Sequence, residues 1–597
     1  MNNAILNKYN ILLKNLKTDE DTSAKKINQI IRTSLHTFCK SHKNPAIWCL
    51  GKHTRMLMAD FMNEMKNVKI IIDSSKNNLE NTGFQIITPG QIETYDIDGI
   101  IISSYVYKDE IKEELQKKHK AVEYLDLYEQ LASQGILLKS SYFSRVHPYS
   151  KYQVINELQQ LYKNAKTTKL KIRYLKEIIK KYILIKDFQS AIRYAKLLVS
   201  LSEDKENRIL LQELEEICHM VEKQVSKISS GNVVMLCIDG LRRQDLLNGK
   251  LPKLLSWTER NGYFFDHAYS SSTSTYESLL PVYSSNHDLK TKYYEKNILS
   301  ETECPFIKKA CKQNRKIFFY TDTEPYIDCK KIRMNGLSQT MSEKLWDFIH
   351  DAIDENHGVF YIHILYESHY SYVNPYTENT LVADGSNIMF DFLETKGGKL
   401  RTDYISQQKD ALQYIDNLLF PFLNLLPCRT VLYADHGNIL MDKSDSLESL
   451  DPLKYSCHKD LLEVPIIIKC PELPPQRDPR LISLMELNTI LCSLLEKKPY
   501  NYQDVPYIKA QRSRIYNPDF QYLYKKYGKE QELQAFELFI FPDGVQLLIY
   551  ENGDVKVLSP PKNVPMNLTQ RIELILSDIT VCNKLNTAYF EKNYGGL

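Results

Sequence analysis

Two apolar segments that lie far apart in the chain each run directly into an aspartate at a turn that contains glycine. Asn232 to Gly240 is NVVMLCIDG, and Val431 to Gly437 is VLYADHG. A short apolar run bounded by a turn signal predicts a buried strand, and glycine lets the chain turn sharply after it. Open α/β sheets place their chemistry at the carboxyl ends of the strands. The sequence therefore predicts an α/β fold in which Asp239, Asp435 and His436 follow such strand ends.

A hydroxyl-rich turn lies between these two strands in the sequence. Tyr269 to Pro281 is YSSSTSTYESLLP, in which Thr273, Ser274 and Thr275 precede a short amphipathic helix. All three are common N-cap residues, so helix capping is one interpretation. The other is a nucleophile at the helix N-terminus, where free N–H groups and the helix dipole favour a phosphoryl or sulfuryl oxygen. The two strand-end carboxylates favour the second interpretation.

Five segments in this order resemble the alkaline phosphatase superfamily, in its sulfatase-like, phosphoryl-transferring branch. They are the strand and LRRQDLL around Asp239, then LPKLLSWTERNGYFFDHAYSSSTSTYESLLP, FYIHILYESHYSY, VLYADHG and HKDLLEVPIIIKCP. The resemblance covers residues 231–510 and implies the central sheet and flanking helices of that superfamily. Five matches in the family's order are more specific than any single one.

The resemblance implies roles for the matching residues. Asp239, Asp435 and His436 match metal ligands, and Thr273 matches the nucleophile that also contacts the metal. The TSTYE run around Thr273 is most similar to lipoteichoic acid synthases and phosphoethanolamine transferases. This ligand set, rich in oxygen with one nitrogen, suits one divalent metal, Zn²⁺ or Mn²⁺.

Two further histidines match positions near the substrate in the family. His369 corresponds to a histidine close to the substrate phosphate, and it could protonate the departing oxygen. His458 falls where the family often has a second-metal ligand or a phosphoryl contact. The expected reaction has two steps: phospho-Thr273 forms, and an acceptor hydroxyl or water then removes the phosphoryl group.

Departures from the family pattern narrow the expected chemistry. Sulfatases carry a C/S-x-P-x-R motif that becomes formylglycine, and the sequence around Thr273 does not have that form. Two-metal members carry an Asp-x-x-x-His pair, whereas this chain has HILYESH, with His363, Glu367 and His369 at other spacings. We therefore expect one metal and no hydrolysis of sulfate esters.

Several neighbouring residues have an ordinary structural interpretation beside a functional one. His363 lies within an apolar strand, which is more typical of a hydrogen-bonded core histidine than of a ligand. Arg242 and Arg243 could contact phosphate or belong to a solvated loop. Glu277 could steady the turn from the same helix face as Thr273.

At 597 residues the chain is too long for one core. We expect four parts: a Rossmann-like α/β domain at 1–147, a helical connector that resembles tetratricopeptide repeats at 148–230, the catalytic domain at 231–510 and a small β-rich subdomain at 511–597. In the last part, PDG and ENGD are hairpin-turn signals between alternating strands.

The first part alternates strand-like and helical patterns, which is typical of a parallel sheet. It resembles Rossmann-like domains attached to enzymes that modify bacterial surface polysaccharides. Its first turn has only Gly51 where a dinucleotide fingerprint needs three glycines, although Asp73 ends the second strand, where a ribose-binding acid would lie. Docking or a structural role is therefore favoured over nucleotide binding.

Charge and cysteine usage give expectations about partners and location. Lys and Arg outnumber Asp and Glu between residues 151 and 200, which allows peripheral contact with an anionic membrane or glycan, or simply a solvated helix face. Basic residues are not interleaved with aromatic ones, so we expect no nucleic acid. The sequence has no signal peptide pattern and no apolar run of membrane-spanning length. Scattered cysteines without C-x-x-C pairs indicate a cytoplasmic protein.

These observations predict a metal-dependent transferase. It would move a substituted phosphoryl group (phosphoethanolamine, phosphoglycerol or phosphoramidate type) from a phosphodiester or nucleotide-activated donor to a carbohydrate acceptor, in capsule or surface polysaccharide biosynthesis. One alternative is a phosphodiesterase or phosphatase of the same superfamily. Another is an inactive scaffold that binds glycan or a partner enzyme.

Overall fold

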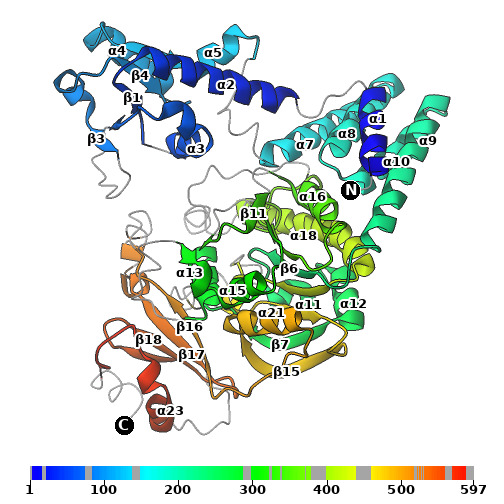
Figure 1. Cartoon of the computed structure of the whole chain (residues 1–597), viewed down its shortest axis with the longest axis vertical. Helices are drawn as coiled ribbons and strands as arrows, with labels where there is room; N and C mark the ends of the chain where they lie inside the picture. The colour runs from blue at the N-terminus through cyan, green and yellow to red at the C-terminus, as the bar shows by residue number, and fades with distance from the viewer. Residues whose placement is uncertain are drawn as a thin grey trace. The chain divides into compact units, whose positions relative to one another are not determined.

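The computed structural model describes residues 3–16, 22–50, 52–73, 84–105, 107–136, 148–286, 298–321, 326–335, 339–369, 372–377, 399–438, 457, 459–515, 521, 524–525, 528, 530–558 and 568–586 (Figure 1). The chain divides into two compact units. One comprises residues 13–151, and the other comprises residues 1–12 together with 152–597. The division near residue 150 lies close to the boundary expected from the sequence, whereas the first twelve residues belong to the second unit.

The unit of residues 13–151 is a five-stranded parallel sheet in the order β3-β2-β1-β4-β5. Its strands are β1 (Pro45–Trp48), β2 (Ile70–Ile72), β3 (Gln85–Ile87), β4 (Gly99–Ile102) and β5 (Glu123–Asp126), and its helices are α2 (Thr22–Ser41), α3 (Lys52–Phe61), α4 (Lys108–Lys118) and α5 (Leu127–Ser133). This order matches the first five positions of the Rossmann order 3-2-1-4-5-6, so the Rossmann-like prediction is confirmed. Alternate strand residues pack on opposite faces, with Ile47 on one and Trp48 on the other.

The first turn of this sheet is held by Asp73. Its Oδ2 accepts a hydrogen bond from the Leu50 backbone N–H at 2.7 Å. Gly51 lies outside the described residues. This hydrogen bond ties the segment that follows β1 to the end of β2.

Four helices predicted between residues 148 and 230 are present. They are α7 (Pro148–Asn164), α8 (Thr168–Leu184), α9 (Phe188–Leu201) and α10 (Lys205–Val225). The N-terminal helix α1 (Asn3–Asn15) joins them, because the buried ring of Tyr9 packs 6.1 Å from Phe188 and 5.4 Å from Trp346. The domain boundaries expected from the sequence place this helix in the Rossmann-like domain, residues 1–147. Its apolar face is instead buried in the second unit.

The second unit is built on an eight-stranded mixed sheet in the order β11-β9-β12-β6-β13-β14-β7-β15. The strands are β6 (Val233–Ile238), β7 (Tyr263–Tyr269), β9 (Ile317–Tyr320), β11 (Ile332–Asn335), β12 (Val359–Ile364), β13 (Arg429–Tyr433), β14 (Ile466–Lys469) and β15 (Gln476–Ser483). The five strands from β11 to β13 are parallel, and β14 is antiparallel to both of its neighbours. This arrangement confirms the predicted α/β class with a central sheet.

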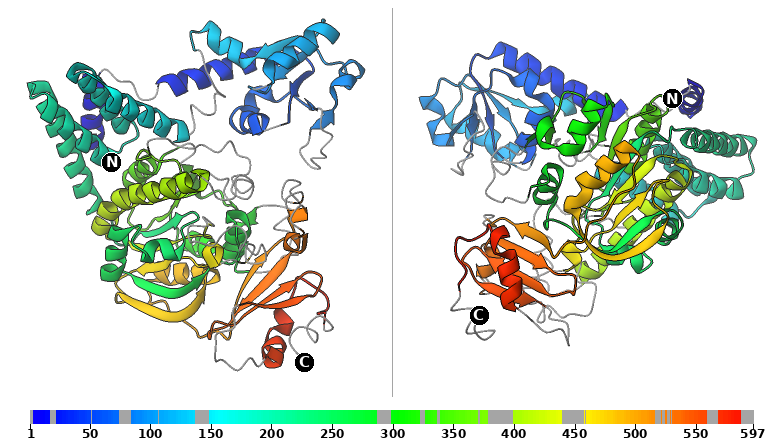
Figure 2. Two further views of the ribbon diagram at one scale, coloured as in Figure 1. Left: turned by 180° about the vertical axis from the view of Figure 1, so that it is seen from behind. Right: turned by 60° about the horizontal axis from the view of Figure 1, so that its bottom comes forward.

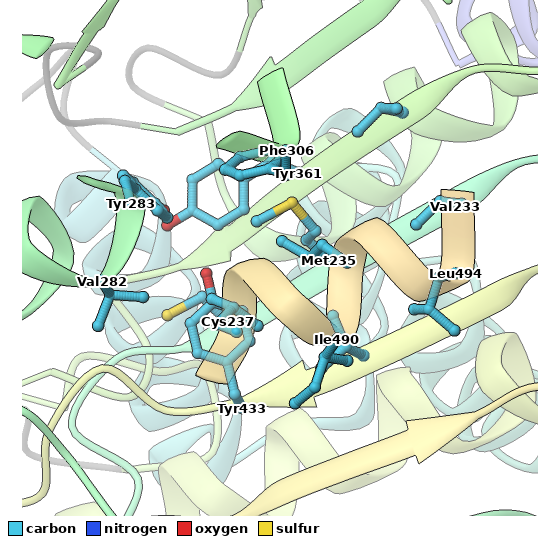
Figure 3. Close-up of a cluster of buried hydrophobic side chains, with 14 of the residues drawn as sticks. Val233, Met235, Cys237, Val282, Tyr283, Phe306, Tyr361, Tyr433, Ile490 and Leu494 are labelled. Carbon is cyan, nitrogen blue, oxygen red and sulfur yellow. The ribbon is translucent and has the colours of Figure 1, made fainter. Parts of the chain in front are cut away.

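Helices cover both faces of this sheet. Met235, Cys237, Tyr361 and Tyr433 point to one face, where they pack with α13 (Thr275–Ser284), α15 (Pro305–Lys312) and α21 (Leu487–Glu496), as Figure 3 shows. Val234 and the other alternate residues point to the opposite face, against α12 (Pro252–Asn261), α16 (Met341–Ala352) and α18 (Lys399–Leu425). The short helices α11 (Arg243–Leu247) and α20 (Lys459–Leu462) and the parallel pair β8 (Leu299–Ser300) and β10 (Ile327–Asp328) complete this region. Strands buried on both faces explain the continuous apolar runs in the sequence.

A four-stranded antiparallel sheet forms the C-terminal part, with α23 (Leu568–Ile575) packed on one face (Figure 2). Its strands are β16 (Ile508–Arg512), β17 (Phe536–Ile540), β18 (Gln546–Tyr550) and β19 (Val555–Leu558). Gly544 and Gly553 have φ of 84° and 86° in the two predicted hairpin turns. The sheet begins with β16, so its first strand spans the expected boundary at residue 510.

Within the residues that the structure describes, no helix combines the length and apolar character needed to cross a membrane.

Candidate functional site

The ends of β6 and β13 bring Asp239, Asp435 and His436 together. These strands are parallel neighbours, and Cys237 is in register with Tyr433, so each aspartate lies two residues beyond a paired position. Both aspartates are fully buried, and His436 is 5 % exposed. Its Nε2 lies 3.8 Å from Asp239 Oδ1 and 3.6 Å from Asp435 Oδ2. One ligand atom from each of the three residues lies within 4.8 Å of the other two.

These three residues fit a divalent cation. Asp239 Oδ1 and Asp435 Oδ2 are buried and have no hydrogen-bond partner among the described residues. His436 Nδ1 lies 2.7 Å from the Gly437 carbonyl oxygen, so we assign the ring proton to Nδ1. The lone pair of Nε2 then faces the two carboxylates, which is the tautomer that a metal ligand requires. Two buried carboxylates without a cation would be costly.

The carboxylates of Asp239 and Asp435 repel each other when both are ionised and no cation lies between them. Burial and the neighbouring Asp239 raise the pKa of Asp435. Burial also opposes the ionisation of Asp239, but His369, the hydrogen bond from His363 and the charge of His436 outweigh it and lower the pKa of Asp239. A divalent cation would allow both carboxylates to stay ionised.

Thr275, rather than Thr273, is the hydroxyl that the structure places against these ligands. Thr275 is the first residue of α13, and its Oγ1 donates to Asp239 Oδ2 at 3.1 Å and lies 3.2 Å from His436 Nε2. Thr273 lies two residues earlier, in the turn before the helix. Ser274 has the extended backbone of an N-cap, with φ of −149° and ψ of 154°. The Ser274-x-x-Glu277 spacing, typical of a capping box, was a signal that would have placed Thr275 at the first helical position.

Serine side chains and Glu277 hold the N-terminus of α13 against the end of β13. The hydroxyls of Ser270 and Ser278 both donate to the Asp435 carbonyl oxygen, the latter at 2.7 Å. Glu277 accepts from Ser272 Oγ at 3.2 Å and from the hydroxyl of Ser513, just after β16. Glu277 therefore steadies the turn, as the sequence suggested, and also links it to the C-terminal sheet.

His363 is a buried histidine with a hydrogen bond on each ring nitrogen. Its Nε2 lies 3.2 Å from Asp239 Oδ2, and its Nδ1 lies 3.1 Å from Thr321 Oγ1, at the end of β9. The interpretation as a hydrogen-bonded core histidine is confirmed. Because its partner is Asp239, His363 also orients a candidate metal ligand, which the sequence pattern did not reveal.

Three other residues were candidates for contact with the substrate: His369, His458 and Arg242. The ring of His369 lies beside that of His436, with centroids 6.4 Å apart and planes at 82°. His458 lies outside the described residues. Arg242 is fully buried between Asp245 and Asp460, with nitrogen–oxygen distances of 2.6 and 3.1 Å, so it is neither solvated nor free to bind phosphate.

Two glycines allow the strand ends to approach each other. Gly240 has φ of 67°, and its N–H donates to Asp435 Oδ1 at 3.2 Å. A Cβ atom at Gly437 would lie 1.9 Å from the Asp460 carbonyl oxygen. Side chains at these positions would force the ligand-bearing turns apart.

Comparisons with known proteins give one family match and several structural neighbours. Residues 41–123 match a family model described as C2185-like, N-terminal. The sequence has no significant match among curated proteins. Similar solved structures include a 2-O GAG sulfatase, at 12 % identity and TM-score 0.38, covering 58 % of this chain and 89 % of that one.

A protein in the alkaline phosphatase superfamily from Vibrio parahaemolyticus has 12 % identity and TM-score 0.38, covering 60 % of this chain and 95 % of that one. The lipooligosaccharide phosphoethanolamine transferase A from Neisseria meningitidis has 13 % identity and TM-score 0.33, covering 54 % and 70 %. Of these three proteins, the one from Vibrio parahaemolyticus is described as a member of the superfamily that the sequence motifs resemble. At this distance, the chemistry of this chain must be inferred from its own side chains.

Replacing His363 by alanine should weaken metal binding at Asp239 by about 10- to 100-fold, the usual cost of losing a partner that orients a ligand. Mn²⁺ titration by calorimetry measures this affinity. His350→Ala is the matched control, because His350 is half exposed on α16. Equal affinities in the two variants would contradict the assigned role.

Mn²⁺ affinity should also fall as the pH is lowered, because protons compete for His436. Burial opposes its protonation, but Asp435 and Asp239 outweigh burial and raise its pKa. A raised pKa means that proton uptake begins above the value of about 6.5 at which an ordinary histidine titrates. Affinity measured at a series of pH values should therefore decline already near neutrality. His436→Gln should bind more weakly and show a shallower decline, and a flat wild-type profile would refute the expectation.

Proposed function

We propose that the chain is a metal-dependent phosphoryl transferase that acts through a phospho-Thr275 intermediate. The observation that carries this proposal is the position of the Thr275 hydroxyl, 3.1 Å from Asp239 and 3.2 Å from His436, beside buried carboxylate oxygens that have no other partner among the described residues. Asp239, Asp435 and His436 would hold the cation. When bound, a divalent cation would lower the pKa of the threonine hydroxyl and neutralise charge on the phosphoryl group.

The residues around Thr275 support its role as the nucleophile. It opens α13, a helix of ten residues, whose first backbone N–H groups lack partners within the helix. Such N–H groups favour phosphoryl oxygens. The hydrogen bond to Asp239 orients the hydroxyl, and the serine contacts to the Asp435 carbonyl keep the helix start in place. Little reorganisation would therefore accompany attack on phosphorus.

The reaction would proceed in two displacements. Thr275 Oγ1 releases its hydroxyl proton to solvent and forms a bond to phosphorus while the bond to the donor's leaving oxygen breaks, and His369 supplies a proton to that oxygen. An acceptor hydroxyl then passes its proton to His369 and attacks the phosphorus of phospho-Thr275. The acceptor receives the substituted phosphoryl group, and Thr275 leaves with a proton from solvent as the free threonine. A bound cation would supply Lewis acidity in both steps, and the N-terminus of α13 would stabilise negative charge on the phosphoryl oxygens.

A second part of the proposal is the chemical identity of the donor and of the acceptor. We infer a phosphodiester or nucleotide-activated donor that carries phosphoethanolamine, phosphoglycerol or a phosphoramidate, and a carbohydrate acceptor of a capsule or surface polysaccharide. The TSTYE segment and the Rossmann-like unit support this inference by resemblance. Location in the cytoplasm and peripheral membrane contact stay predictions.

Incubation with a phosphodiester donor should add the mass of the transferred group to the wild-type chain. Thr275→Ala should abolish this adduct and lower turnover by at least about 10³-fold, as expected for a lost nucleophile. Thr273→Ala is the matched control and should keep both. Intact-mass spectrometry of acid-quenched samples makes the measurement, and an adduct that survives in Thr275→Ala but is absent from Thr273→Ala would reverse the assignment.

Transfer and hydrolysis can be separated once the adduct forms. Addition of acceptor oligosaccharides should hasten the loss of phospho-Thr275 and yield a phosphorylated glycan, because a bound hydroxyl competes well with water. Quenched-flow mass spectrometry follows both products. Loss at an unchanged rate, with only free phosphate ester released, would identify a hydrolase of the same superfamily instead.

A further inference from the structure

A second cluster of metal-ligand side chains lies at the ends of the small parallel pair β8 and β10. Ser300 is in register with Asp328, so Glu301 and Cys329, the next residues, emerge side by side. Cys311 reaches the same point from the last turn of α15. One ligand atom from each of the three residues lies within 4.8 Å of the other two. None of them belongs to the Asp239 site.

The spacing of these atoms matches zinc coordination. Cys311 Sγ and Cys329 Sγ are 3.9 Å apart, and Cys329 Sγ lies 3.3 Å from Glu301 Oε2. With Zn–S bonds of about 2.3 Å, Zn–O bonds of about 2.0 Å and tetrahedral angles, two sulfurs lie about 3.8 Å apart and sulfur and oxygen about 3.5 Å apart. A disulfide would require about 2.05 Å between the sulfurs. Two of the three spacings therefore match a tetrahedral zinc site, and the ligand atoms of Cys311 and Glu301 lie within 4.8 Å of each other.

Both cysteines of this group are buried, and one already interacts with Glu301. Cys311 is 6 % exposed and Cys329 9 % exposed. Burial and the neighbouring Glu301 carboxylate raise the pKa of the Cys311 thiol to about 12. Without a cation, the Cys329 thiol donates to Glu301 Oε2 at 3.3 Å, whereas Zn²⁺ would displace the thiol protons and bind all three groups. Lys331 lies close by, with Nζ donating to the Cys311 carbonyl oxygen at 3.3 Å.

We propose that Glu301, Cys311 and Cys329 bind a Zn²⁺ ion, with a water molecule as the fourth ligand. Binding forms two Zn–S bonds and one Zn–O bond, and the two thiol protons pass to solvent. Two thiolates and one carboxylate around Zn²⁺ leave a net charge of −1, which Lys331 partly offsets. The soft sulfur ligands favour Zn²⁺ and disfavour Mn²⁺.

This ion would stabilise the segment that packs against the nucleophile helix. Tyr326 precedes β10 directly, and its carbonyl accepts from the Leu299 N–H at 2.7 Å. The ring of Tyr326 packs edge-on against Tyr276, with centroids 5.8 Å apart, and Tyr276 follows Thr275. An ion bound by these three residues would therefore join β8, α15 and β10 next to Tyr276, near the start of α13. The proposal does not depend on the reaction that Thr275 performs.

Zinc analysis of the full chain tests the proposal. In an Asp239→Asn background, which removes the other candidate site, the chain purified under reducing conditions and loaded with Zn²⁺ should retain one ion per chain. X-ray absorption at the zinc edge should show sulfur neighbours at about 2.3 Å. Adding Cys311→Ser and Cys329→Ser should remove this ion. Cys492→Ser, a half-buried cysteine on α21, is the matched control and should keep it.

Several results would overturn the proposal. These are equal zinc content with and without the two cysteines, zinc with only oxygen and nitrogen neighbours, and a Cys311–Cys329 disulfide in a non-reducing peptide map. If the double variant does not fold, cobalt loading of the Asp239→Asn chain decides the question. A thiolate-to-cobalt charge-transfer band supports the site, and its absence refutes it.

Discussion

Two buried carboxylates at the ends of adjacent parallel strands determine how the rest of the second unit is arranged. Asp239 and Asp435 follow β6 and β13 at matching register positions, where sheet pairing holds them close in spite of their repulsion. Every element nearby supplies a partner for one of them: Thr275 and His363 bond to Asp239, while Gly240 bonds to Asp435. One oxygen of each carboxylate is left without a partner among the described residues, and both belong to the three-residue group with His436. The surrounding fold thus holds the two carboxylates close together. A bound cation would offset the free-energy cost of burying them side by side.

Much of this arrangement could be predicted because strand ends are visible in a sequence. Continuous apolar runs indicated β6 and β13, and the acidic residues after them had to lie at one edge once both strands were parallel. The parallel sheet of the first unit was predictable in the same way, from alternating strand and helix patterns. By contrast, β5 (Glu123–Asp126) was not predicted, because its short, half-buried segment has a weak pattern.

The parts that escaped prediction depend on helix register or on long-range pairing. Thr273 and Thr275 are the same residue type in one short turn, and only the start of α13 decides which hydroxyl meets Asp239. For Arg242 the sequence left phosphate contact and a solvated loop open, and neither is found, because Asp245 and Asp460, which lies far along the chain, pair with it. The cysteine cluster was equally hidden, since the pairing of β8 with β10 is what brings Cys329 beside Glu301.

The two clusters differ in a way that matches different tasks. At Asp239, hard oxygen ligands and one imidazole keep a cation strongly Lewis acidic, and the Thr275 hydroxyl lies against the same ligands. At Cys311, two thiolates would donate more charge to an ion and bind it tightly. Tyr326 and Tyr276 connect the second cluster to α13, the helix that begins with Thr275. Loss of the sulfur-bound ion would therefore loosen the position of Thr275 without changing any ligand of the first site, so the two metals would affect turnover through separable routes.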